Sequence, residues 1–225
     1  MYRILYLSIL ILNKYHRFVA INSKPKKMKI KTCTKLLLTV FALSFSLAAH
    51  GLGFGPVAGV NLANITGDNS TGNAMKIGFH VGGVVELSIT DNFIIAPGLL
   101  YSIKGSQDKD NSKLKLNLSY LEIPINAKYR MESGFNIFAG PYIGLLMSAT
   151  LTDGTTDFDS KDFVETTDFG LNVGLGFDME SGFGFSAQYG LGLANINKDV
   201  AGITSSDSNT NAVIGISLRY MLGGK

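Results

Sequence analysis

The sequence of 225 residues has no tryptophan, one cysteine and five prolines, and only 16% of its residues are charged. The single cysteine, Cys33, lies in a basic N-terminal segment, so the chain after residue 51 has no thiol. Disulfides, thiolate metal sites and cysteine nucleophiles are therefore excluded from that part of the chain. Packing and hydrogen bonding must stabilise it without covalent cross-links.

Acidic residues are absent from the first 51 positions, which hold nine of the 20 lysine and arginine residues. The rest of the chain carries 11 basic and 17 acidic side chains, a net charge of −6. The overall charge of +3 thus comes from the N-terminal segment. Because the larger part of the chain is acidic, the sequence predicts no nucleic-acid partner.

The N-terminal segment has the pattern of a secretion signal. Basic residues from Met28 to Lys35 precede an apolar run at 36–49, and small residues follow, so we expect cleavage after Ala48, Ala49 or Gly51. The alternative is a membrane anchor, but the run is shorter than the roughly 20 residues of a spanning helix. We therefore predict a signal peptide at 28–51, an upstream segment at 1–27 that reflects a start codon assigned too early, and one domain at 52–225.

Helical periodicity is missing after residue 55, and alternation of apolar and polar residues replaces it. In 76–89, for example, Ile77, Phe79 and Val81 alternate with Lys76, Gly78 and His80. A change of parity within 114–130 predicts a β-bulge near Ser119 and Tyr120. The sequence predicts eight strands, at 55–63, 76–89, 93–104, 114–130, 135–148, 166–179, 183–194 and 211–222.

The connections between these runs alternate in length. Three are short, at 90–92, 131–134 and 180–182, whereas the connections at 64–75, 105–113, 149–165 and 195–210 are longer and polar. Strict alternation places all short turns at one end of an up-and-down barrel. We therefore predict an all-β fold, an eight-stranded antiparallel up-and-down transmembrane β-barrel with short periplasmic turns and longer extracellular loops.

The outward face decides between a membrane barrel and a soluble ligand-binding barrel, which would keep its apolar residues inside. Here one face of the runs is bulky and apolar, and the other is built of Gly, Ser, Asn and a few ionisable residues, which suits a narrow lumen. Aromatic residues on the apolar face near the short turns predict a ring at the membrane interface: Phe93, Tyr129, Phe135, Phe177, Phe183 and Tyr220. A second, less regular ring would contain Tyr101, Tyr120, Phe169 and Tyr189.

Three blocks of the sequence are similar to those of a known family. "GLLYSIKG" (98–105), "YLEIPINAKYR" (120–130) and "FAGPYIGLL" (138–146) resemble the PorT-like outer-membrane β-barrel proteins of Bacteroidetes-type bacteria. The resemblance covers most of 55–222 and implies an eight-stranded barrel. The best-known member of that family is linked to a secretion and gliding system.

The inward face collects ionisable side chains that must pair, because an isolated buried charge is very costly. The expected polar network of the lumen consists of Glu86, Lys104, Glu122, Lys128, Arg130, Asp178 and Arg219. Two interpretations stay open: an internal ion-pair network that fills the lumen, and a polar path for small ions or protons.

Other chemistry has weak support. His80 is the only histidine after the cleavage region, and neither "DKDNS" (108–112) nor "DFDSKD" (157–162) has the pattern of a calcium loop. We expect no catalytic residue, metal or cofactor, and an exported protein of the outer membrane. Its expected function is structural or accessory, with a narrow pore or a soluble periplasmic barrel as alternatives. Its expected partners are outer-membrane lipid, the outer-membrane assembly machinery and an envelope or secretion protein.

Overall fold

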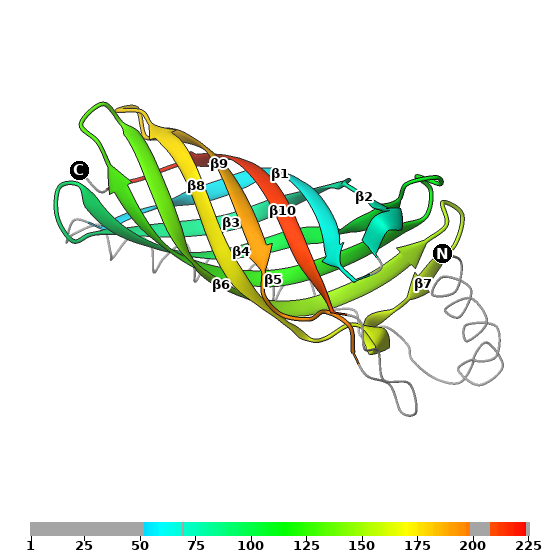
Figure 1. Cartoon of the computed structure of the whole chain (residues 1–225). Helices are drawn as coiled ribbons and strands as arrows, with labels where there is room; N and C mark the ends of the chain where they lie inside the picture. Colours follow the sequence, from blue (N-terminus) through cyan, green and yellow to red (C-terminus); the bar gives the residue numbers. More distant parts are fainter. Residues whose placement is uncertain (1–51, 69, 199–207, 224–225) are drawn as a thin grey trace, which may run out of the picture. The chain divides into compact units, whose positions relative to one another are not determined.

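A computed structural model describes residues 52–68, 70–198 and 208–223. The predicted signal peptide and upstream segment lie outside these residues. Within them the chain is almost entirely β-structure (Figure 1). The long strands are β1 (Leu52–Gly67), β3 (Lys76–Ser88), β4 (Phe93–Asp108), β5 (Lys115–Arg130), β6 (Phe135–Thr152), β8 (Thr167–Asp178), β9 (Phe183–Gly192) and β10 (Asn209–Tyr220).

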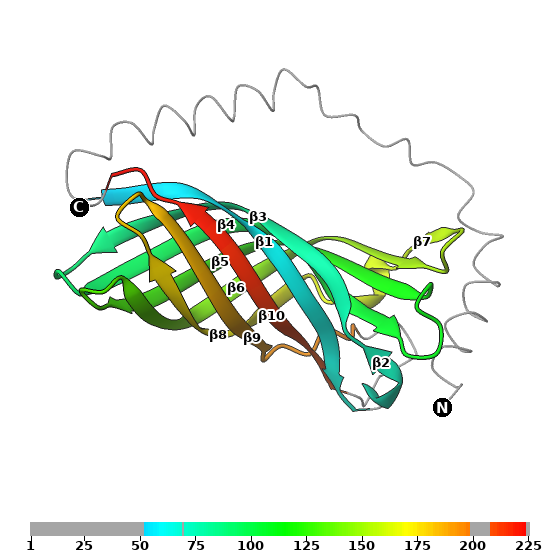
Figure 2. The same cartoon turned by 90° about the horizontal axis from the view of Figure 1, so that it is seen from above.

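These strands form a closed antiparallel barrel (Figure 2). Each pairs with its neighbour along the chain, and β1 also pairs with β10 from Val57 opposite Arg219 to Gly67 opposite Asn209. Closure removes the free edges that a bilayer would leave unpaired. The predicted eight-stranded up-and-down barrel is confirmed. In the described residues, no helix is long and apolar enough to cross a membrane.

Several strands continue past the predicted runs at the end that carries the long loops. β4 reaches Asp108 and β6 reaches Thr152, and two short strands, β2 (Asn73–Ala74) and β7 (Asp157–Asp159), pair with them. Two 3₁₀ turns, η2 (Ser70–Gly72) and η3 (Lys161–Phe163), lie in the loops. In these extensions the strands stay paired through their backbones, but apolar and polar residues no longer alternate. The predicted strands were shorter because the prediction relied on that alternation.

The predicted bulge is present, but its extra residue belongs to β6. Ser119 of β5 lies opposite Ser148, and Tyr120 lies opposite Leu146, so Met147 is the additional residue. The change of apolar parity along β5 is not a reversal of side-chain direction, because Leu118 and Tyr120 both point inward and are fully buried. Tyr120 therefore does not belong to an outer aromatic ring; Tyr101, Phe169 and Tyr189 of the same predicted ring are exposed.

The pentapeptide Met-Glu-Ser-Gly-Phe occurs twice, and both copies form the same tight turn. In each, the N–H of Met donates to the carbonyl of Phe four residues on, and the Gly N–H donates back to the Met carbonyl. Gly134 and Gly182 adopt positive φ angles of 86° and 90°, which favour glycine. The carbonyl of each glycine also accepts a hydrogen bond from the next strand, at Asp178 and Met221. The repeat thus marks two equivalent turns at one rim of the barrel.

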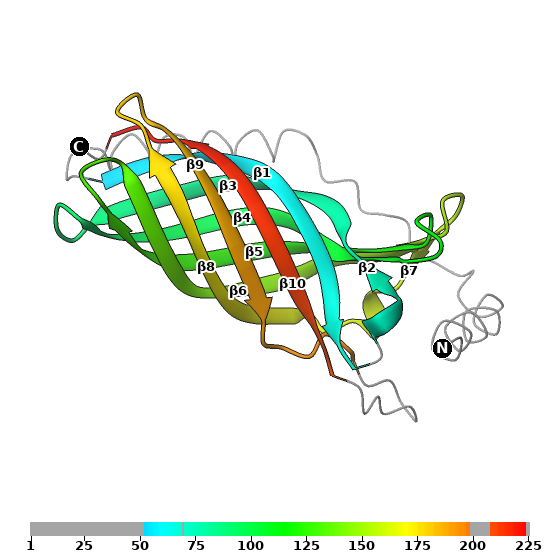
Figure 3. The ribbon, with the colours of Figure 1, turned by 45° about the horizontal axis from the view of Figure 1, so that its top comes forward.

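The barrel wall is apolar outside and polar inside. Ile77, Ile137 and Val173 of the outward face are at least half exposed, whereas Asn61, Lys104 and Asp168 of the inward face are almost fully buried. This is the reverse of a soluble ligand-binding barrel. Figure 3 shows the short turns at the left end of the barrel and the β2, β4–β5 and β6–β7 segments at the right end.

Candidate functional site in the barrel lumen

The predicted lumen network is divided into two groups. The turn-end cluster contains Glu86 of β3, Lys128 and Arg130 of β5, Asp178 of β8 and Arg219 of β10. Lys128 Nζ pairs with Glu86 and lies 3.0 Å from Asp178 Oδ2, and Arg130 bridges the same two carboxylates. Arg219 pairs with Asp178 and lies 4.0 Å from Glu86. Three cations surround two carboxylates, so the cluster has one excess positive charge.

The loop-end cluster forms around Lys104 of β4. Its Nζ lies 2.6 Å from Glu122 Oε2 and 3.3 Å from Asp168 Oδ2. Two neutral groups also donate to Asp168 Oδ2: the Tyr142 hydroxyl at 3.3 Å and Asn211 Nδ2 at 3.1 Å. The Lys104 ammonium also lies 4.1 Å from the centre of the Tyr142 ring. One cation faces two carboxylates here, and all three charged side chains are at most 5% exposed.

A chain of hydrogen bonds, the seam chain, crosses the junction between the first and last strands. His80 of β3 contacts Asn61 Oδ1 of β1 through Nδ1 and the Ser217 hydroxyl of β10 through Nε2, both at 2.8 Å. Asn61 Nδ2 donates to Ser102 of β4, which orients its oxygen towards the imidazole. His80 therefore carries its proton on Nδ1 and accepts from Ser217. A side chain at Gly59 would lie 2.5 Å from this ring, so only glycine fits there.

This arrangement has the order of a nucleophile, a base and an orienting group. All three side chains are nevertheless buried within the lumen, at 2%, 4% and 8% exposure for Asn61, His80 and Ser217. A substrate would have to pass an ion cluster or the apolar cap described next. The geometry instead holds β10, β1, β3 and β4 together across the seam.

An apolar cap closes the loop end of the lumen. Val164 and Ile196, from two different loops, pack with Tyr120, Leu146 and their neighbours; the buried members are Ile65, Leu118, Tyr120, Leu146, Ala149, Val164 and Ile196. The Glu165 N–H donates to the Ile196 carbonyl at 2.9 Å, which ties the two loops to each other. The cap could not be predicted from the sequence, because four of its residues lie in segments that were predicted as polar loops: Ile65, Ala149, Val164 and Ile196.

The predicted interface aromatics lie on the outer face at the turn end, with exposures from 36% to 47%. They form three cross-strand pairs: Phe93 with Tyr129, Phe135 with Phe177, and Phe183 with Tyr220. In each pair, the two strands are connected along the chain by a long loop at the other end of the barrel. The aromatic pair therefore lies across these two strands at the turn end, where no loop connects them. The rings of Phe183 and Tyr220 lie 4.8 Å apart.

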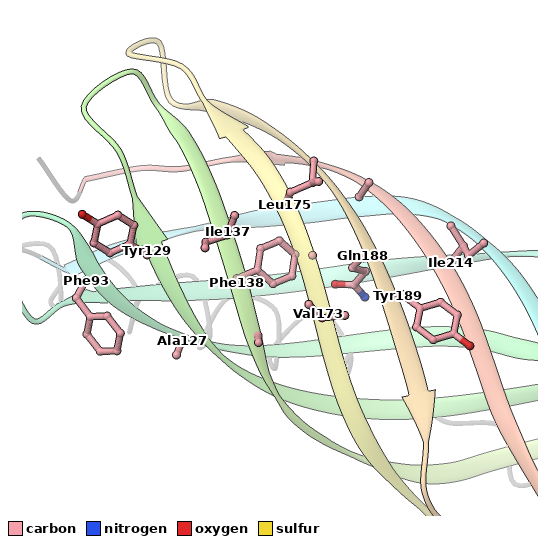
Figure 4. Close-up of a pocket in the computed structure, with 13 residues that line it drawn as sticks. Phe93, Ala127, Tyr129, Ile137, Phe138, Val173, Leu175, Gln188, Tyr189 and Ile214 are labelled. Carbon is pink, nitrogen blue, oxygen red and sulfur yellow. The ribbon is translucent and has the colours of Figure 1, made fainter.

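A shallow groove of about 800 Å³ runs over the outer wall (Figure 4). Small residues such as Ala127 and Ala139 lie between larger apolar ones such as Tyr129, Ile137 and Tyr189. No charged side chain lines it. Polar groups converge in most ligand sites, so we interpret this groove as part of the apolar wall.

The loop carboxylates organise their own turns. Asp108 Oδ1 accepts the N–H groups of Asp110 and Asn111, and Asp153 Oδ1 accepts those of Thr155 and Thr156. The Thr155 hydroxyl and these N–H groups lower the pKa of Asp153 below its ordinary value of 3.8. Throughout 52–68, 70–198 and 208–223, no group of three or more His, Cys, Asp or Glu side chains is placed to hold a metal ion.

A closed barrel with an apolar outer wall, a polar lumen and short turns at one end defines a transmembrane β-barrel. A family model for the outer membrane protein beta-barrel domain matches residues 41–198, and the chain belongs to this family. Membership implies an outer-membrane location. No curated protein matches the chain.

Solved structures of outer-membrane proteins resemble the chain at low sequence identity. Neisserial surface protein A is 15% identical, with 76% of this chain and 96% of that one covered and a TM-score of 0.46. The attachment invasion locus protein Ail of Yersinia pestis, in complex with sucrose octasulfate, is 11% identical, with 76% and 99% covered and a TM-score of 0.47. The outer membrane enzyme PagL is 11% identical, with 73% and 98% covered and a TM-score of 0.40.

Proposed function

We propose that this protein is a non-enzymatic accessory barrel that binds an envelope protein through its loop end and does not conduct solutes through its lumen. The main support is the way the lumen is filled. The turn-end cluster, the seam chain, the loop-end cluster and the apolar cap occupy it at successive levels. Eight strands leave an interior just wide enough for side chains, so a continuous water path would require these groups to separate.

The proposed binding surface is the loop-end extension, residues 105–117 and 148–160. Here β4 and β5 stay paired from Gly105 opposite Asn117 to Gln107 opposite Lys115, and β7 adds to the edge of β6. Lys109, Asp110 and Asp157 project from it as exposed polar side chains. Because the backbone is already ordered, binding would cost less conformational entropy than it would for a free loop.

Within the family, we propose a closer kinship with PorT-like proteins, and hence a secretion-related partner. The three resembling blocks lie on the adjacent strands β4, β5 and β6. The same strands carry the loop-end extension and Lys104, Glu122 and Tyr142 of the loop-end cluster. The strands that resemble PorT-like proteins are therefore the same strands that carry the proposed binding surface for the partner.

Shortening the extension tests this proposal. Replacement of 106–115 and of 151–158 by short Gly-Ser turns should leave the barrel folded, as shown by its different gel migration before and after boiling. The variants should lose an envelope protein that co-purifies with the unaltered chain. A matched change in the β1–β3 connection, replacing 68–72, should retain it. Equal retention by all variants would contradict the assignment of the binding surface.

A narrow pore is the second candidate, since polar side chains follow the lumen from Lys76 to Arg219. In that case the ion pairs would have to exchange partners as an ion or proton passes. Ion conductance separates the two functions, because the accessory role predicts none.

A further inference from the structure

A small cavity lies inside the lumen between the seam chain and the loop-end cluster. Its polar lining includes Lys104, Glu122 and Asn172, and Leu100 and Val213 give it apolar sides. Its volume is about 10 Å³. A single water molecule needs roughly 10–15 Å³, so the cavity has room for one particle of that size and no more.

The lining includes a buried side-chain donor that has no partner among the described residues. Asn172 is only 3% exposed, and its Nδ2 makes no hydrogen bond with the described residues. A buried donor without a partner destabilises the folded state. Across the cavity, Glu122 Oε2 pairs with Lys104 at 2.6 Å but keeps lone pairs for a further donor. A donor and an acceptor therefore line the same small space.

We propose that this cavity is a binding site for one water molecule, which accepts a hydrogen bond from Asn172 Nδ2 and donates one to Glu122. The charges around the cavity favour a neutral occupant. The Lys104 ammonium repels a cation and the Glu122 carboxylate repels an anion. The bound water links Asn172 of β8 to Glu122 of β5 across the lumen.

The site does not depend on the proposed accessory function. A single enclosed water differs from the file of waters that a pore would contain. Its exchange with bulk water requires the ion clusters or the apolar cap to open. The occupant should therefore stay bound for longer than a nanosecond, which nuclear magnetic resonance can detect.

The test uses the refolded chain in detergent micelles, with ¹⁵N-labelled asparagine. We expect cross-relaxation between the water resonance and the Asn172 side-chain amide protons, with the sign of a long-lived water. Gly190→Ala should abolish this signal, because the new methyl group would lie in the cavity lining, 3.0 Å from Asn172 Oδ1. Gly144→Ala adds a methyl group near Tyr120, outside the cavity lining, and should retain the signal.

Two results would overturn the proposal. One is the absence of a water signal at Asn172 in the unaltered chain, a measurement that needs no variant to fold. The other is a shift of the Asn172 resonances when sodium is exchanged for potassium or ammonium, which would identify a cation as the occupant.

Discussion

The two ion clusters of the lumen both compensate buried carboxylates, but they do so with different groups. The turn-end cluster consists only of charged groups, and its Arg130 side chain is 25% exposed at the rim. The loop-end cluster is sealed beneath the apolar cap and has one cation for two carboxylates, with Tyr142 and Asn211 as neutral donors. Near the rim, water can solvate an excess charge. In the sealed interior, neutral hydrogen-bond donors replace the second cation.

Because of this difference, the two clusters should not tolerate the same change equally. Removing one partner of a buried ion pair leaves a charge without compensation, whereas a cluster with spare cations can rearrange. Matched substitutions in the two clusters therefore test the comparison directly.

The largest effect should follow from Lys104→Met. Glu122 and Asp168 would both lose their only cation, and the barrel should lose about 3–5 kcal/mol of unfolding free energy. Reversible denaturant unfolding in lipid vesicles measures this loss. Adding Glu122→Gln and Asp168→Asn to Lys104→Met should recover most of it, because no charged side chain would remain in the loop-end cluster.

Lys128→Met is the matched change in the turn-end cluster and should cost less, about 2 kcal/mol. Arg130 and Arg219 still contact Asp178, and Arg130 still pairs with Glu86. The same unfolding measurement applies. A loss equal to that of Lys104→Met would show that the spare cations of the turn-end cluster do not compensate.

His80→Leu should destabilise the seam by between about 1 and 2 kcal/mol, because Asn61 Oδ1 and Ser217 lose their partner. Ser217→Ala removes only one of the two hydrogen bonds and should cost less. Amide hydrogen exchange of β10 and β1 should increase before that of β6 and β8. Uniform exchange across all strands would contradict a local role at the seam.

The smallest effect concerns the turns. Gly134→Ala should cost about 1 kcal/mol for the positive φ angle, and its Cβ would also lie 2.2 Å from the Asp178 carbonyl. Gly154→Ala has a similar φ of 93°, but its Cβ would meet only the flexible Lys113 side chain. Gly134→Ala should therefore lower the midpoint of denaturant unfolding more than Gly154→Ala. The reverse order would mean that the turn-end rim is not rigid.

Most of the fold could be predicted from alternation and connection length. These patterns report which residues face lipid and where the chain reverses, and both are local properties. The strand extensions of β4 and β6 could not be predicted, because backbone pairing above the membrane does not require apolar alternation. The same limit misplaced Tyr120, whose apolar neighbours Leu116 and Leu118 face a cap and not lipid.

The lumen was harder to predict than the wall. Parity places Glu86, Lys128 and Asp178 inside, but the division into two clusters depends on strand stagger, which single strands do not encode. Tyr142 and Asn211 donate to Asp168 from strands far apart in sequence. The cap depends on Val164 and Ile196 in loops, where no periodic pattern marks a buried residue.

We propose that the filled lumen stabilises the barrel and does not conduct solutes, while the loop-end extension binds the partner. Conductance of the purified, refolded barrel in planar bilayers tests it most directly. We expect no steady single-channel current for the unaltered chain. Steady unit currents that Glu122→Gln or Lys128→Ala changes or abolishes would contradict it and establish the pore.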